Sequence, residues 1–565
     1  MQIVNEEESK IKRHNFSKWG YETIALTWGC LAFLCACGLS GANHWLGSLL
    51  LVGSAVGLYF YFAFIVDRGN VISLKALFSA FWLGTIGLAN LKLLGYQRRW
   101  ELETWFVLGL TYGSFLLAFM IMEECGYDRI VTAIRRYIKH PSNGLRVQNN
   151  RLFTICVITT LIGLFSFIAN IAIKGFVPFF VTDDYMAYYD FYTRFNIFTV
   201  ASTAGSGLCY YTLKKQPLSR WKKVVLLACI VYEVLIMPIL AVSRGTQMIA
   251  LLSLMVSIVT LSRRKFVTFV MCMLIAFGTY EIGSTARNLS NEYLAYVFQP
   301  KEITLSQQET QATEPVLCIP KETVSDNSEA QMESTAPNDN QIEEAPNVAV
   351  EPSVPAQSMP NENPVDSQLV QTEPTEPQET AQTETTAPSQ CYPQDETNAP
   401  QNQQASFSLP PRLAFLYGYL TVSHDNCNEA VLHQSDYSYG LRQLQAFTAV
   451  LRFPKLKEVI SNLKFWQVND ALNTGNLITD AYYDFGALGS GLFMFIWACV
   501  FAFIEIHNRR KRSPFSLLVL GNCMVPVVLC FFESWMSYFT FWLLWGTDLL
   551  LYLAATIQFG KRKVD

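Results

Sequence analysis

Residues 224–261 read "VVLLACIVYEVLIMPILAVSRGTQMIALLSLMVSIVTL", two apolar runs joined by the polar sequence Ser243-Arg244-Gly245. Each run is close to the length needed to cross a bilayer core of roughly 30 Å. An arginine is costly inside a membrane, so Arg244 is expected at the boundary between two spans. The stretch therefore predicts a hairpin of two transmembrane helices, with Arg244 at its turn, Ser243 capping the second helix and Gly245 allowing the backbone to turn.

Similar apolar runs recur along the 565-residue chain, of which 51% is hydrophobic. They are too long and too poor in charge for ordinary buried helices. The sequence therefore predicts an all-α polytopic membrane protein with about twelve transmembrane helices. The predicted spans cover residues 21–39, 45–66, 74–94, 104–122, 152–173, 195–213, 224–241, 246–261, 266–282, 482–504, 515–532 and 538–557.

Lysine and arginine in the short loops predict the orientation, because cytoplasmic loops carry an excess of both. The basic sequences "KIKRHNFSK", "YDRIVTAIRRYIKHPSNGLR", "KKQPLSRWKK", "SRRK", "HNRRKR" and "KRK" all fall on one side if the spans alternate. We therefore expect both termini in the cytoplasm. The leader 1–20 is charged and has no cleavage site, so no cleavable signal peptide is expected.

A long extracytoplasmic loop is predicted between the ninth and tenth spans. Residues 301–406 hold two lysines and nineteen acids, a net charge of −17, which leaves +13 for the rest of a chain whose total is −4. So polar a segment cannot bury enough surface to offset its ordering entropy, and disorder is expected. A tolerated insertion, a spacer and a tether for a partner all remain open. The expected organisation is a cytoplasmic tail at 1–20, helices at 21–283, the loop start at 284–300, the acidic insert at 301–408, an ordered amphipathic segment at 409–480, helices at 481–557 and a tail at 558–565.

The ordered part of this loop contains leucine and phenylalanine at helical spacing over residues 441–451, which predicts an amphipathic helix on the outer membrane surface. Of fourteen cysteines, only Cys318, Cys391 and Cys427 fall outside the membrane on this topology. Their spacing suggests no disulfide framework, and a bond between Cys318 and Cys391 remains open.

The chain contains no Gly-rich phosphate loop, no HExxH and no paired CxxC, so we expect no metal, no cofactor and no nucleic-acid partner. Several arginines nevertheless fall at the outer ends of spans, where the charge rule predicts few. Guanidinium groups at that depth suit a lipid phosphate or pyrophosphate, although headgroup snorkelling is the alternative. Arg99 and Arg442 are interpreted as solvated surface residues; the arginines singled out are Arg98, Arg194, Arg244 and Arg287.

Two further stretches place polar groups at the outer boundary. Residues 175–195, "GFVPFFVTDDYMAYYDFYTRF", combine Asp184 with aromatic residues, typical either of a sugar-binding surface or of an interfacial aromatic belt. Residues 469–495, "NDALNTGNLITDAYYDFGALGSGLFMF", lead into the tenth span. There Asp480 or Thr479 is a candidate helix cap, and Asp484 either pairs with an arginine or handles a substrate.

Three stretches together resemble the bacterial O-antigen polymerases, also called oligosaccharide repeat-unit polymerases. They are "SRGTQMIALL" from Ser243, "YGYLTVSHDNCNEAV" from Tyr417 and "NTGNLITDAYYDFGALGSGL" from Asn473. The order of these stretches and the large loop before the last helices are also similar to that family. The acidic insert is not typical of it.

The resemblance implies a GT-C-like integral glycosyltransferase of the bacterial cytoplasmic membrane. It would transfer a growing glycan from one undecaprenyl pyrophosphate to a hydroxyl on another lipid-linked repeat unit. Its expected partners are lipid-linked oligosaccharides and membrane lipids, with a chain-length regulator and a flippase of the same pathway as further partners. A glycan ligase, a flippase and a structural scaffold are the alternatives.

The site residues follow from the arginines together with this resemblance. A base is needed for the acceptor proton, and His424, Asp425, Asp484 and Glu292 are the candidates. The catalytic residues are predicted to be Arg244, Arg287, His424 and Asp484. The substrate-binding residues are predicted to be Arg98, Arg194, Asp184, Asn473, Thr474 and Tyr483.

Overall fold

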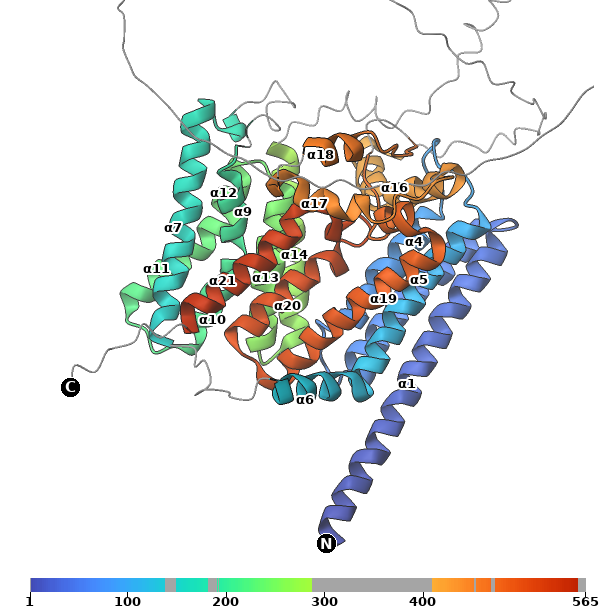
Figure 1. The fold of residues 1–565 in the computed structure, drawn as a ribbon, viewed down its shortest axis with the longest axis horizontal. Helices are drawn as coiled ribbons and strands as arrows, with labels where there is room; N and C mark the ends of the chain where they lie inside the picture. Colours follow the sequence, from blue (N-terminus) through green and yellow to red (C-terminus); the bar gives the residue numbers. More distant parts are fainter. Residues whose placement is uncertain are drawn as a thin grey trace, which may run out of the picture. The chain divides into compact units, whose positions relative to one another are not determined.

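The structure is a computed structural model, and every regular element in its described segments is a helix (Figure 1). The described residues are 2–137, 149–180, 191, 193–286, 409–451, 454–468 and 473–556. All of them lie in one unit formed by residues 1–302 and 405–565. The predicted insert at 301–408 lies outside the described residues, as do Cys318 and Cys391, while Cys427 is a buried free thiol.

Eight helices in the described part of the chain are long and apolar enough to cross a membrane. Each corresponds to a predicted span, because a long uncharged run has few stable alternatives to a membrane helix. The eight are Trp19–Ser40, His44–Val66, Leu102–Ile134, Arg151–Lys174, Arg220–Leu240, Arg244–Leu261, Thr479–Lys511 and Phe539–Thr556.

The four other predicted spans coincide with shorter or broken helices. Three are apolar helices at Leu74–Ala89, Lys265–Thr279 and Pro514–Val528. The fourth is divided into α9 (Asn196–Thr203) and α10 (Gly205–Lys215). The all-helical, membrane-protein prediction is confirmed, whereas the count of twelve spans and the GT-C-like class stay predictions.

The main helices of the first half are α1 (Gln2–Ser40), α2 (His44–Phe60), α3 (Leu74–Phe78), α4 (Gly84–Ala89), α5 (Leu102–Ile121), α6 (Tyr127–Tyr137), α7 (Asn149–Lys174), α11 (Arg220–Val231), α12 (Met237–Leu240), α13 (Arg244–Leu261) and α14 (Lys265–Ala286). The second half contributes α16 (Pro411–His433), α17 (Leu441–Leu451), α18 (Pro454–Ser461), α19 (Thr479–Lys511), α20 (Pro514–Val528) and α21 (Phe539–Thr556). Short π-helical turns join several of them: η1 (Tyr61–Val66), η2 (Ser79–Leu83), η3 (Met122–Gly126) and η5 (Tyr232–Ile236).

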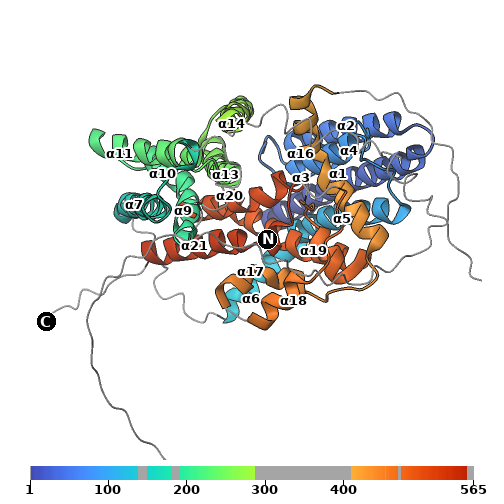
Figure 2. The same cartoon turned by 90° about the horizontal axis from the view of Figure 1, so that it is seen from above.

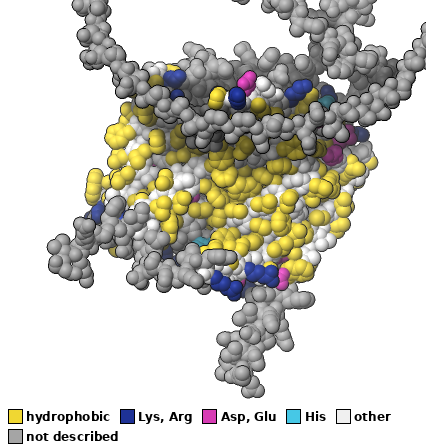
Figure 3. Space-filling model, in the orientation of Figure 1, with side chains coloured by type: hydrophobic (Ala, Val, Ile, Leu, Met, Phe, Trp, Pro, Cys, Tyr) yellow, Lys and Arg dark blue, Asp and Glu magenta, His cyan; other side chains and the backbone are white. Residues whose placement is uncertain are grey.

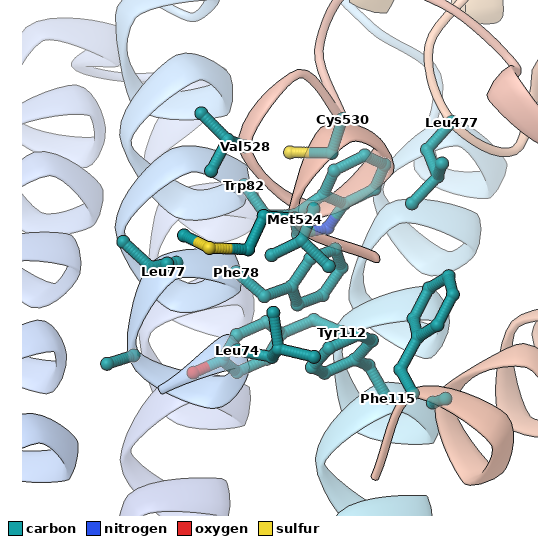
Figure 4. Packing of buried hydrophobic residues seen from close by; sticks show 14 of the residues in the cluster. Leu74, Leu77, Phe78, Trp82, Tyr112, Phe115, Leu477, Met524, Val528 and Cys530 are labelled. Carbon is teal, nitrogen blue, oxygen red and sulfur yellow. The ribbon is translucent and has the colours of Figure 1, made fainter. Parts of the chain in front are cut away.

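Large aromatic side chains form the centre of the hydrophobic core (Figure 4). Phe78 stacks on Phe115 of α5 with ring centroids 3.9 Å apart. Trp82 is fully buried beside Phe78, and its indole N–H donates to the Leu108 carbonyl at 3.1 Å. Aromatic burial of this kind stabilises the contact between the η2 segment and α5.

The helices have two different ends in Figure 1, one carrying α16, α17 and α18 and the other carrying α6. We call these the α16 end and the α6 end. Figure 2 shows the same helices from above, with α16, α17 and α18 over the half of the unit that contains α5 and α19. On the face in Figure 3, hydrophobic side chains cover the surface between the two ends. Leu488, Leu492 and Ile496 of α19 are exposed at four-residue spacing, as lipid-facing side chains are.

The α6 end holds a buried charge network that the sequence did not predict. Arg509 Nη1 lies 2.9 Å from Asp67 and 3.2 Å from Glu123. Lys75, 1% exposed, places its Nζ within 4 Å of three carboxylates: Glu22 at 2.5 Å, Glu123 at 3.1 Å and Asp67 at 3.6 Å. Shared carboxylates of this kind tie α1, α3, η3 and α19 together, since removing one partner leaves another charge buried.

Candidate functional site

Helix α16 brings the three family-like stretches together. It packs against α4, α5 and α19 at the α16 end, and residues 421–430 on it are all buried. The sequence predicts an ordered segment here, but not a helix whose buried turns are rich in polar side chains. Such burial is stable only when each polar group has a partner, and the partners come from the loops around α16.

His424 lies at the centre of these buried turns and is 0% exposed. Its Nε2 lies 3.0 Å from Thr85 Oγ1, and its Nδ1 accepts from Asn476 Nδ2 at 3.2 Å. Burial, reinforced by the nearby Lys92, lowers the pKa of His424 to about 3, so the ring is neutral at ordinary pH. With both nitrogens engaged inside the protein, the geometry favours a structural role over the predicted base.

Asp425, the next residue, anchors the loop that follows α4. Its carboxylate accepts from Lys92 Nζ at 2.7 Å, from Gln97 Nε2 at 2.7 Å and from Trp100 Nε1 at 2.8 Å. The Lys92 ammonium also lies 3.9 Å from the Trp100 ring centroid. Because the same loop carries Arg98, this anchoring holds the exposed Arg98 side chain at the α16 end.

The stretch before α19 is joined to α16 and to the loop after α20. Asn426 Nδ2 donates to the Thr474 carbonyl at 2.7 Å, while Asn473 beside it is exposed. Ser534 Oγ donates to the Asn476 carbonyl at 2.7 Å and accepts from Asp480 N at 3.2 Å. The predicted cap at Thr479 or Asp480 is wrong, because the residue preceding α19 is Ile478 and no side chain caps it.

Arg244 begins α13 and is only 6% exposed. Ser243 caps the helix as predicted, with its Oγ accepting from Thr246 N at 3.4 Å. The tight turn, however, is made by Val242 with φ of 51°, whereas Gly245 lies inside α13 with open space around its missing Cβ. The expected role of Gly245 in turning the backbone is therefore wrong.

Beside Arg244 lies a cavity of about 220 Å³ whose other walls are apolar. Phe277 on its edge is 54% exposed, so the cavity reaches the lipid-facing surface of α14. Arg244 Cζ also lies 5.4 Å from the Phe415 ring centroid of α16. A buried cation thus borders a hydrocarbon-lined space; its walls include Phe81, Met248, Met273, Leu416, Tyr419, Phe531, Phe532 and Trp535.

Glu533, which follows the cavity-lining Phe531 and Phe532 in the chain but does not itself line the cavity, was not predicted from the sequence. Burial, with a smaller contribution from Asp480, raises the pKa of the Glu533 carboxyl to about 7. A carboxyl with a pKa near the working pH is suited to proton transfer. The only sequence signal is one acid in the mostly apolar "LCFFESWM".

Asp484 is fully buried and caps α17, although it lies about 40 residues after the start of that helix in the chain. Its Oδ1 accepts from Arg442 N at 3.1 Å and from Ser438 Oγ at 2.5 Å, and its Oδ2 accepts from Gln443 N at 3.1 Å. Arg442 and Gln443 are the second and third residues of α17, and backbone amides at the start of a helix have no acceptor within the helix. The carboxylate is therefore occupied in fixing α17, which accounts for its burial without the predicted catalytic role.

Tyr483 and Arg442 form the neighbouring contact. The Tyr483 hydroxyl accepts from Trp466 N at 2.7 Å, and Arg442 Cζ lies 3.9 Å from the Tyr483 ring centroid. Arg442 is only 8% exposed, so its interpretation as a solvated surface residue is wrong. The amphipathic pattern of residues 441–451 does not predict that residues 462–466 cover the first turn of α17.

The remaining predicted site residues are not brought to this region by any described contact. Arg194 is exposed in the turn before α9. Asp184, Arg287 and Glu292 lie outside the described residues, so their predicted roles stay predictions.

Comparisons with protein-family models, with curated proteins and with solved structures gave no match for this chain. What the site does therefore has to be inferred from its own residues. Those residues are a buried arginine beside an apolar cavity, a titratable carboxyl that follows two cavity-lining residues in the chain, and a polar helix joined to the segment before α19.

Proposed function

We propose that this protein joins lipid-linked oligosaccharide repeat units into a polysaccharide, as the resemblance to O-antigen polymerases implies. In this proposal the chain resides in a bacterial cytoplasmic membrane with a GT-C-like arrangement of about twelve spans. Both termini lie in the cytoplasm, and the α16 end faces outward.

The observation that carries the proposal is Arg244 at the border of the apolar cavity. A polyprenyl pyrophosphate combines a hydrocarbon chain with a doubly anionic headgroup, and the cavity and the guanidinium match those two parts. A planar guanidinium binds two phosphate oxygens at once, which a lysine cannot do. Arg287 is the proposed second arm on the same diphosphate.

The proposed reaction forms one bond and breaks one. The acceptor hydroxyl oxygen bonds to the anomeric carbon of the donor glycan while the bond from that carbon to the pyrophosphate oxygen breaks. Negative charge then develops on the leaving diphosphate, where a fixed Arg244 stabilises it more than water would. The hydroxyl proton passes to a base, and Glu533 is the proposed one, because it follows the cavity-lining Phe531 and Phe532 in the chain and its pKa is raised to about 7.

The test is polymer formation by the purified protein in liposomes from lipid-linked repeat units of its own host. A ladder of increasing glycan length on the lipid supports polymerisation. A single transfer to a different acceptor would indicate a ligase, and movement of the substrate across the bilayer without new bonds would indicate a flippase. Arg412→Ala, an exposed arginine in the first turn of α16, is the matched control for Arg244→Ala.

A further inference from the structure

A second cavity, of about 410 Å³, lies at the α16 end. It is formed by the last residue of α16, the turn 434–440, the first residues of α17 and the segment 462–466. Its walls are aromatic and polar, unlike the apolar walls beside Arg244. The volume is within the range of small-ligand sites, about 300–1,000 Å³.

The backbone around this cavity is held in unusual conformations. Tyr439 has φ of 48° and Gly440 has φ of 94°, while Gly486 under the turn has φ of 69°. Ser438 N donates to the Tyr483 carbonyl and Tyr439 N to the Asp484 carbonyl, each at 3.0 Å. Positive φ in a non-glycine residue costs free energy and persists where the surroundings impose it, frequently at binding sites.

Arg442 supplies the charge on the cavity wall. Its guanidinium stacks on Tyr483, one nitrogen donates to the Lys464 carbonyl, and Nη1 lies 3.9 Å from Asp480. Its Nε is buried and has no hydrogen-bond partner among the described residues. An anion bound in the cavity would reduce the free-energy cost of burying this guanidinium, because the carboxylate paired with it, that of Asp480, lies 3.9 Å from Nη1.

Aromatic side chains provide flat surfaces beside this cation. Trp466 packs on His433 with ring centroids 4.8 Å apart, and Lys464 Nζ lies 5.7 Å from the Trp466 ring. Tyr439 is 84% exposed and lines the opening. Aromatic faces bind the C–H faces of sugar rings, and the two cations exceed the single carboxylate of the lining, that of Asp436.

We propose that this cavity binds a saccharide carrying an anionic group, with the sugar ring on the aromatic residues and the anion beside the two cations of the lining, Arg442 and Lys464. Joined to the proposed function, it is the subsite for the acceptor glycan, separate from the Arg244 cavity. Saccharide binding here is measurable without any transfer reaction, so failure of the subsite and failure of the polymerase proposal are distinguishable.

The test uses the full chain in lipid nanodiscs and isothermal calorimetry with two probes. One is a tetrasaccharide of alternating glucuronic acid and N-acetylglucosamine, and the other is the neutral N-acetylglucosamine tetramer. We expect the acidic probe to bind at least tenfold more tightly. Arg442→Gln should abolish this preference, and Lys464→Gln, which alters an exposed side chain, should weaken acidic binding a few-fold.

Arg412→Ala is the control and should leave saccharide binding unchanged, because its exposed side chain is not part of the cavity lining. Equal affinity for both probes, or undiminished acidic binding in both Arg442→Gln and Lys464→Gln, would overturn the proposal. So would complete absence of binding at concentrations of about 1 mM, or displacement of the acidic probe by an equal concentration of inorganic phosphate.

Discussion

The guanidinium carbon of Arg244 lies 5.4 Å from the centre of the Phe415 ring, which joins the start of α13 to the start of α16. This contact fixes a cation where an apolar cavity borders the polar residues of α16. A cation on an aromatic face keeps its charge while losing water, which strengthens its interaction with an incoming anion.

The first prediction concerns the chemistry of that cation. If Arg244 holds the leaving diphosphate with two parallel hydrogen bonds, Arg244→Lys should fail nearly as severely as Arg244→Ala. Loss of a contact made mainly in the transition state should slow polymer formation by roughly 10²–10³-fold. The measurement is the rate of ladder formation in liposomes, normalised to inserted protein. Near-normal ladders from both Arg244→Ala and Arg287→Ala would show that neither arginine holds the diphosphate.

Glu533 allows a prediction of pH dependence. Its pKa is raised to about 7, so the fraction of carboxylate rises as the pH increases through 7. A base must be deprotonated, and the polymerisation rate should therefore rise from pH 6 to 8. Glu533→Gln should lower the rate by about 10²–10⁴-fold and remove that rise. An unchanged pH profile in Glu533→Gln would exclude it as the base.

His424 allows a prediction about stability. Its pKa is about 3 in the folded protein against about 6.5 in an unfolded chain, so the unfolded state binds more protons between these values. The stabilisation that the neutral, buried His424 ring contributes is fully present above pH 6.5 and is lost as the pH falls toward 3. Thermal unfolding in detergent should show a shallower decline from pH 7 to 5 for His424→Gln than for the natural sequence. Equal declines in the two proteins would contradict the structural role.

The sequence could predict most of the membrane helices because a long apolar run alone determines them. The helices at Trp19–Ser40 and His44–Val66 agree with their predicted spans to within two residues at each end. It could not predict how α16 is buried, since the partners of Asp425 are Lys92, Gln97 and Trp100, more than 300 residues away in the chain. Contacts between residues so far apart in the chain produce no repeating pattern in the sequence from which they could be predicted.

The same limit applies to the candidate site. The position of Arg244 at the start of a helix followed from the two apolar runs around it, whereas its burial involves Phe415, far away in the chain. The burial of Arg442 likewise depends on segment 462–466, which covers the first turn of α17. Asp484 illustrates a related problem, because a buried carboxylate at a span entrance is equally typical of a catalytic acid and of a helix cap. Only the positions of the Arg442 and Gln443 amides distinguish the two.

Asp484 therefore gives the last prediction. If its role is to cap α17, Asp484→Asn keeps an acceptor oxygen and should cost about 1 kcal/mol of stability while leaving substantial polymer formation. Asp484→Ala leaves the α17 amides and the Ser438 hydroxyl without that acceptor and should cost about 1–3 kcal/mol, seen as a lower thermal midpoint in detergent. Ser438→Ala, which removes one donor to the same carboxylate, is the matched control and should have the smallest effect. A protein with Asp484→Asn that unfolds at the natural temperature but forms no polymer would contradict the capping role and restore Asp484 as a catalytic residue.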